Sequence, residues 1–131
     1  MPSADMCTEE EIIQLVNWFY ESMRKDEVLG PIFNHHVKDW DTHLSTMVDF
    51  WSSTLRGSAR FRGAPMLKHT ALPGLSFELF ERWLMLFRQT TDALPNAALG
   101  QRASELARRI AQSLWHGYQM SRDADKLLGV V

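Results

Sequence analysis

The five histidines of this 131-residue chain are the side chains best suited to chemistry, because a neutral imidazole binds metal ions and changes its charge near physiological pH. They are His35, His36, His43, His69 and His116. A single histidine is more often exposed, or held in a core by a hydrogen bond, than it is a ligand. A functional role for any of the five therefore needs support from its surroundings.

His69 has the most unusual surroundings. It lies in a short segment, 66–72, between Pro65 and the pair Pro73-Gly74, and this segment has too few apolar residues to form a core helix of its own. A short, rigid helix that presents one imidazole is suited to ligating a metal such as the iron of haem. Because the chain has no Cys-x-x-Cys-His motif, a haem bound here would be held without covalent attachment.

Three further side chains could donate hydrogen bonds to a ligand. Tyr20 shares the apolar stripe of the first predicted helix, His43 opens the inner stripe of the second, and Trp83 lies on the apolar face of the third. A buried phenol, imidazole or indole needs a partner for its polar atom. The spacing leaves open whether that partner is a group of the protein core or a bound ligand.

A basic stretch precedes His69 and contains Arg56, Arg60, Arg62 and Lys68. Such a stretch is usually a solvated loop. Next to a ligand-binding histidine, the same cations could pair with two carboxylates of the ligand.

Four long amphipathic stretches must position these residues. Thr8 and Glu11 have the spacing of a capping box, and the apolar residues that follow recur every three or four positions. The first predicted helix covers about 8–25 and ends before Gly30-Pro31, and the second runs from a cap at Asp39 or Asp41 to about 55. The third runs from a cap at Ser76 through 87, and the fourth begins after Pro95-Asn96 and ends at about 120. The pattern predicts one all-α domain over 1–131, with its core in about 8–120, a short flexible N-terminus and a C-terminal tail.

The composition excludes several classes of protein. Fourteen basic and 16 acidic residues give a net charge of −2, whereas nucleic-acid binders usually carry a strong basic surface. The single Cys7 rules out an internal disulfide framework and a cysteine-based zinc site. The acidic first ten residues do not form a signal peptide, and no apolar run approaches the roughly 18 residues of a membrane span. We therefore expect a cytoplasmic protein without nucleic-acid or membrane partners.

Taken in order, these residues resemble a truncated haemoglobin of group III, a branch of the two-over-two globins. The resemblance covers about 8–120 and rests on Phe19-Tyr20-Glu21, 29–34, His43 with Phe50-Trp51, 63–69, Leu72-Pro73 and 80–87. It implies a globin-like fold, in which two helix pairs form a sandwich around a haem.

The resemblance also implies roles for individual residues. His69 matches the proximal histidine that binds the iron, and Tyr20, His43 and Trp83 match residues that stabilise a ligand on the opposite, distal side. Further residues that it implies in haem binding are Phe33, Phe50, Trp51, Arg62, Met66 and Lys68. The pair His35-His36 matches no role in the family.

The implied cofactor is haem b, and the implied function is reversible binding of oxygen and other diatomic gases (NO, CO). Three distal donors would each stabilise a ligand by about 1 kcal/mol, so oxygen release would be slow. Slow release suits NO, peroxide or oxygen chemistry, or sensing, better than bulk oxygen transport. An NO dioxygenase or peroxidase-like activity stays open and would require a reductase as yet unidentified. We expect a monomer, with a weak dimer as the alternative.

Two other functions compete with this one. Four amphipathic helices would equally serve a haem-free interaction or regulatory domain, because a fold does not determine a function. A non-haem metal site could instead be built from His35, His36 and His43, with Asp39 as the nearby carboxylate.

Overall fold

The structure is a computed structural model that describes residues 5–59 and 76–130, and the side chains of 5–59 and 76–117. These residues form helices and no strand, which confirms the all-α fold class. The helices are α1 (Glu9–Lys25), α2 (Leu29–His36), α3 (Trp40–Arg56), α5 (Phe77–Asp92) and α6 (Ala97–Val130). None of them, over the residues described, combines the length and hydrophobicity that a bilayer crossing requires.

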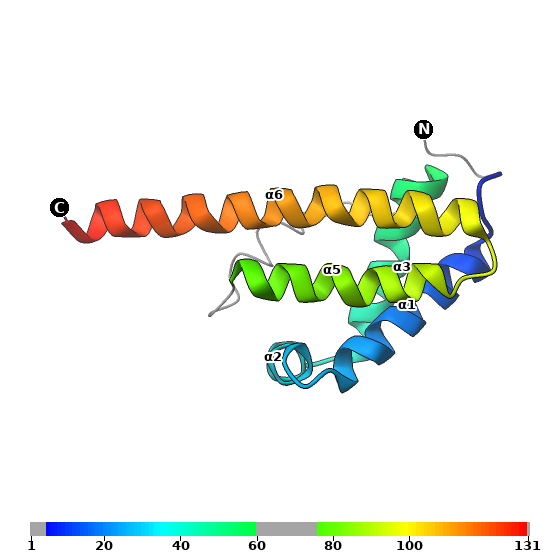
Figure 1. Cartoon of the computed structure of the whole chain (residues 1–131), viewed down its shortest axis with the longest axis horizontal. Helices are drawn as coiled ribbons and strands as arrows, with labels where there is room; N and C mark the ends of the chain where they lie inside the picture. The colour runs from blue at the N-terminus through cyan, green and yellow to red at the C-terminus, as the bar shows by residue number, and fades with distance from the viewer. Residues whose placement is uncertain (1–4, 60–75, 131) are drawn as a thin grey trace.

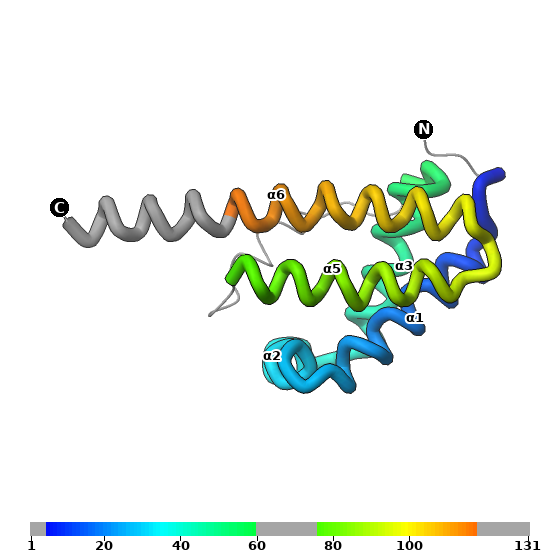
Figure 2. Tube along the Cα trace, in the orientation of Figure 1, coloured from blue at the N-terminus to red at the C-terminus, as the bar shows by residue number. Residues whose placement is uncertain are grey.

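The helices pack as two crossed pairs (Figure 1). Helices α5 and α6 lie side by side and antiparallel, joined by the short connection 93–96, as the trace in Figure 2 shows. Helix α1 packs on α3, and this second pair crosses the first through contacts between α1 and α5. The expected two-over-two arrangement is therefore confirmed.

Local capping signals set the starts of three helices. The Thr8 hydroxyl accepts a hydrogen bond from the Glu11 backbone N–H (3.1 Å), and the Glu11 carboxylate accepts one from the Thr8 N–H (2.9 Å), which completes the predicted capping box. Asp39, rather than Asp41, caps α3, where its carboxylate accepts a hydrogen bond from a backbone N–H of the first turn. Ser76 caps α5 in the same way.

The sequence pattern does not predict helix α2, because Gly30-Pro31 is expected to end helical structure. In the structure both residues lie in the first turn of α2, where a backbone N–H needs no partner within the helix and proline is tolerated. The Asp26 carboxylate accepts hydrogen bonds from the backbone N–H groups of Val28 (3.1 Å) and Leu29 (2.9 Å) and so stabilises this turn. Helix α6 also exceeds its predicted end at about 120 and runs to Val130.

Gly30 is required by the close approach of α2 to the end of α1. A Cβ atom at Gly30 would lie 2.5 Å from the carbonyl oxygen of Arg24, which is closer than real Cβ contacts come. A side chain of any size at this position would push α2 away from α1.

Aromatic rings from three helices form the centre of the core. Phe19 of α1 is 1% exposed, and its ring centroid lies 5.0 Å from that of Phe87 and 5.3 Å from that of Trp83, both on α5. Trp51 of α3 stacks on Phe87 at 5.2 Å. Edge-to-face and offset-stacked rings are the favoured geometries for aromatic pairs, so this cluster ties α1, α3 and α5 together.

Candidate functional site

The packing of α1 on α3 brings Tyr20 and His43 together. Tyr20 is 5% exposed, and its ring centroid lies 5.3 Å from that of His43, with the two rings nearly perpendicular at 85°. The His43 side chain is half-buried, and its Nε2 atom is buried. Two polar rings that sequence reasoning assigned to one site are therefore neighbours in space.

Burial reinforces the protonated state that Tyr20 already has at physiological pH. Loss of solvent around the phenol disfavours the phenolate and raises the pKa of Tyr20 above its usual value. The hydroxyl keeps its proton throughout the physiological pH range, and it can therefore donate a hydrogen bond at every working pH.

Trp83 joins the same cluster through an intermediate ring. Its centroid lies 5.3 Å from that of Phe19, and the Phe19 ring lies 5.1 Å from that of Tyr20. Trp83 also stacks on Phe87 at 5.4 Å, with an interplanar angle of 16°. Its half-buried indole is thus held in the apolar layer between α1 and α5.

An ion pair that sequence reasoning missed fixes the position of α5 next to Trp83. Arg82 donates from Nε to Asp26 Oδ2 (2.7 Å) and from Nη2 to Asp26 Oδ1 (2.8 Å). The hydrogen bonds from Arg82 lower the pKa of Asp26 from its ordinary value of 3.8 to about 2. Because the same carboxylate also stabilises the first turn of α2, one aspartate connects α5 to the α1–α2 turn.

Three residues expected around a haem lie in the aromatic core. Phe33 of α2 is 8% exposed and Trp51 of α3 is 4% exposed. Phe50 is half-buried and meets Trp51 edge to face at 5.3 Å. All three therefore belong to or pack against the hydrophobic core cluster that also contains Tyr20, with Trp83 packed against it.

Four other expected site residues lie outside the described part of the chain. They are Arg62, Met66, Lys68 and His69, all within 60–75.

The alternative of a non-haem metal site is wrong. The ring centroids of His35 and His36 lie 5.1 Å apart on the exposed end of α2. His43, on α3, instead contacts the Tyr20 ring of α1. Among the residues that the structure describes, no group of three or more His, Cys, Asp or Glu side chains comes together in a way that could hold a metal ion.

A second polar network fixes the end of α3, and no local pattern in the sequence predicts it. The fully buried hydroxyl of Ser52 donates to the Glu9 carboxylate, and Arg56 donates both to that carboxylate and to the carbonyl of Cys7 (2.9 Å). These contacts join Cys7 and the first residue of α1 to the last turns of α3.

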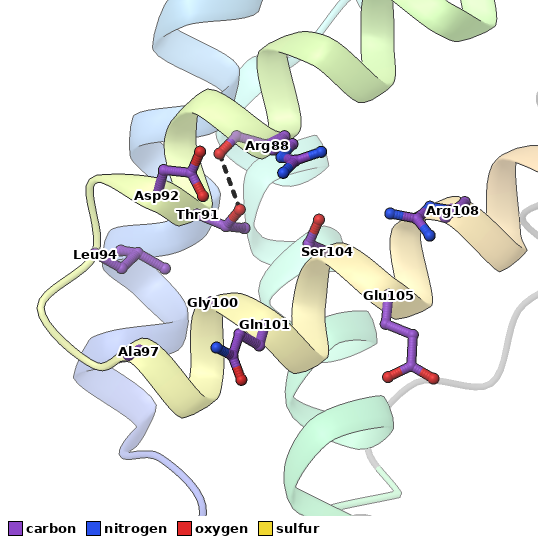
Figure 3. A pocket seen from close by; sticks show the side chains of 10 residues that line it. All are labelled: Arg88, Thr91, Asp92, Leu94, Ala97, Gly100, Gln101, Ser104, Glu105 and Arg108. Atoms are coloured by element: carbon purple, nitrogen blue, oxygen red, sulfur yellow. Dashed lines mark hydrogen bonds between the residues drawn. The ribbon is translucent and has the colours of Figure 1, made fainter.

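Two of the surface hollows among the described residues bear on the search for a ligand site. One, of about 440 Å³, lies beside Tyr20 and is lined by Asn17, Tyr20, Glu21, Arg24, Lys25, Asn34 and Leu44. The other, of about 340 Å³, lies between α5 and α6 (Figure 3). There Arg88 and Arg108 lie on either side of Ser104, while Asp92 and Glu105 supply opposite charges. Only the first hollow includes a residue that the sequence assigned to the site.

The crossed helix pairs, with a tyrosine–histidine contact inside the α1–α3 pair, have the arrangement of a globin of the two-over-two type. The model of the family described as bacterial-like globin matches residues 5–116, and the chain belongs to this family. Membership in the family implies haem-based binding of diatomic gases.

Named relatives place the chain more closely within the family. It is 36% identical over 107 residues to the group 3 truncated hemoglobin of Campylobacter jejuni, a match that covers 79% of this chain and 84% of that protein. The crystal structure of the group III truncated hemoglobin from Campylobacter jejuni matches with a TM-score of 0.77 at 34% identity, covering 87% of this chain and 91% of the other. The resemblance to group III truncated haemoglobins is therefore confirmed.

Proposed function

We propose that this protein binds haem b non-covalently, with His69 as the ligand to the iron. It holds oxygen, NO or CO on the side that faces Tyr20, His43 and Trp83. The observation that carries this proposal is the contact between Tyr20 and His43, because it gathers two hydrogen-bonding side chains within an apolar, aromatic layer.

The described residues fit such a cofactor. Phe33, Phe50 and Trp51 supply apolar rings of the kind that a porphyrin packs against, and the Tyr20 phenol stays protonated beside them. Haem, when bound, supplies an iron atom that takes a diatomic ligand. Arg62, Met66 and Lys68 complete the proposed haem-binding residues, with the two cations directed at the haem carboxylates.

The chain's own side chains would determine how long a ligand stays. The Tyr20 hydroxyl donates at every physiological pH, and His43 donates from a ring nitrogen when that nitrogen carries the proton. Each such hydrogen bond is worth about 1 kcal/mol, or roughly fivefold in affinity. Most of this effect falls on the release rate, because variants of one site differ mainly in dissociation.

Slow release supports chemistry or sensing rather than bulk oxygen transport. We propose reactions with NO, peroxide or oxygen, of the NO dioxygenase or peroxidase-like kind, with electrons supplied by a reductase. We further propose that the protein works in the cytoplasm as a single-domain monomer or weak dimer.

An absorption spectrum of the purified protein tests the haem assignment. We expect an intense Soret band that shifts when the protein is reduced with dithionite and exposed to CO. His69→Ala should lose stable haem binding, whereas His116→Ala, at an exposed position on α6, should keep it. A protein without a Soret band even after addition of haemin would overturn the proposal in favour of a haem-free interaction or regulatory domain.

The distal assignment has its own test. Tyr20→Phe removes one hydroxyl from a buried ring and leaves the ring contacts in place, so oxygen release should accelerate about fivefold to tenfold. Stopped-flow replacement of oxygen by CO measures this rate. An unchanged rate would show that the Tyr20 hydroxyl does not reach the ligand.

A further inference from the structure

Trp40 touches both polar rings of the candidate site. It is the first residue of α3, and its ring centroid lies 5.6 Å from that of His43 and 5.9 Å from that of Tyr20. The Tyr20 and His43 rings are themselves 5.3 Å apart, so the three rings form a closed triangle. His43 therefore meets a ring edge to face on two sides, at 85° to Tyr20 and at 88° to Trp40.

Arg24 covers one face of the Trp40 ring in this triangle. Its guanidinium carbon lies 4.4 Å from the centroid of the Trp40 ring, which is the geometry of a cation–π contact. The backbone at Arg24 is held in turn by α2, because Gly30 packs directly against the Arg24 carbonyl oxygen. The cation that covers Trp40 thus belongs to a well-anchored turn of α1.

The start of α3 is fixed as well. The Asp39 carboxylate accepts hydrogen bonds from the backbone N–H (3.2 Å) and the hydroxyl (2.7 Å) of Thr42. Because Asp39 immediately precedes Trp40, these bonds hold the backbone that carries the indole. Trp40 is therefore held by its own helix cap on one side and by Arg24 on the other.

Space is available next to the triangle. The hollow of about 440 Å³ is lined by Tyr20, Arg24 and Leu44 among others, so the molecule is not tightly packed on this side. Ring contacts and the Arg24 cation, rather than close packing all round, keep the cluster together.

We propose that Trp40, held by Arg24, is a positioning residue that keeps the His43 imidazole in contact with Tyr20. In this arrangement a turn of His43 toward solvent breaks its edge-to-face contact with the Trp40 ring. The consequence for a gas ligand rests on the proposed function: His43 acts on that ligand only while Trp40 holds it in place.

The test compares the distance between the Tyr20 and His43 rings in variants of the purified protein, first as isolated and then, where the protein holds haem, after addition of CO. Trp40→Leu removes the ring, Trp40→Phe keeps an aromatic ring, and Arg24→Gln removes the cation. Nuclear Overhauser contacts between the two labelled rings are expected in the unchanged protein and in Trp40→Phe, weakened in Arg24→Gln, and lost in Trp40→Leu. Oxygen release should be about fivefold faster in Trp40→Leu, equal to the loss of one hydrogen bond.

Trp18→Leu is the matched control, because Trp18 is a partly exposed tryptophan of α1 outside the triangle. It should leave both the ring contact and the release rate unchanged. A role for Trp40 in stability alone would lower the unfolding midpoint of Trp40→Leu but leave the Tyr20–His43 contact intact, and that result would overturn the proposal. Loss of the Tyr20–His43 contact in Trp18→Leu as well as in Trp40→Leu would also overturn the proposal.

Failure of the proposed function is distinguishable from failure of this inference. A protein that binds no haem still reports the contact between the Tyr20 and His43 rings by the same measurement. Loss of that contact in Trp40→Leu would then support the positioning role of Trp40 even though the haem assignment had failed.

Discussion

Replacing Asp26 by asparagine removes the charge from the ion pair that connects α5 to the α1–α2 turn. Asparagine has nearly the same shape, and its carbonyl oxygen can still accept the hydrogen bonds from the Val28 and Leu29 N–H groups. The variant therefore isolates the two charge-assisted bonds from Arg82, at 2.7 Å and 2.8 Å. Helix α2 should remain capped, while α5 loses the bond from Arg82 Nη2 and keeps only an uncharged acceptor for Arg82 Nε.

The exposure of the two partners sets the expected magnitude. The side chain of Asp26 is 8% exposed and that of Arg82 is 35% exposed. Hydrogen bonds to charged groups contribute about 1.5–3 kcal/mol, and exposed ion pairs about 0–1 kcal/mol. We expect Asp26→Asn to lower the free energy of unfolding by about 1–2 kcal/mol at pH 7, since Arg82 is partly screened by water.

The pH dependence gives the sharper signature. The pKa of Asp26 is lowered in the folded protein to about 2, so the unfolded chain binds the proton more readily. The stabilisation by the carboxylate is therefore complete above its ordinary pKa of 3.8 and is lost as the pH falls toward 2. The difference in stability between the protein and Asp26→Asn should be constant near neutral pH and should shrink below about pH 4.

Urea unfolding at a series of pH values measures this difference. Glu21→Gln is the control, because the Glu21–Lys25 pair has exposed side chains (64% and 75%) and should contribute only a few tenths of a kcal/mol. A loss in Asp26→Asn that stays the same from pH 7 down to pH 3 would refute the reasoning, because the effect would then not depend on the ionised carboxylate.

Two further predictions follow from the packing around the site. Gly30→Ala places a Cβ atom 2.5 Å from the Arg24 carbonyl oxygen and should lower the free energy of unfolding, measured in urea, by about 1–3 kcal/mol. An unchanged unfolding midpoint would mean that α2 can shift without cost. In an ultraviolet pH titration, one of the two tyrosines should ionise only when the protein unfolds in alkali, and Tyr20→Phe should remove that late step. Ionisation of both tyrosines in a single step near pH 10 would contradict the burial of Tyr20.

Helix boundaries were predictable where a local signal exists. The capping residues Thr8, Asp39 and Ser76 accept hydrogen bonds from backbone N–H groups three residues further on. Their effect on the helix start can therefore be predicted from neighbouring positions in the sequence. Helix α2 was missed because Gly30 and Pro31 usually interrupt helices. A helix can form here because the Asp26 carboxylate accepts a hydrogen bond from its first turn. Glycine is needed at position 30 because a Cβ atom there would clash with the Arg24 carbonyl oxygen.

The candidate site was predictable only in part. The family resemblance assigns Tyr20 and His43 to one site, whereas helical spacing alone leaves their roles open; the structure places their ring centroids 5.3 Å apart. The parts that hold this pair were not foreseen. Arg82 is 56 residues from Asp26, and Arg24 and Trp40 lie on different helices, so no sequence window contains either pair in a recognisable pattern.

The amino-acid sequence by itself determined that the chain is helical, where three of its helices begin, and which side chains could donate to a ligand. These properties depend on interactions between residues one to four positions apart, which propensity and periodicity describe directly. Only the tertiary structure decided that α2 lies across the end of α1, that Asp26 reaches Arg82, and that Trp40 lies between Arg24 and His43. Such contacts arise when helices distant in sequence bury their apolar faces together, and they depend on crossing geometry and close packing that no single helix contains.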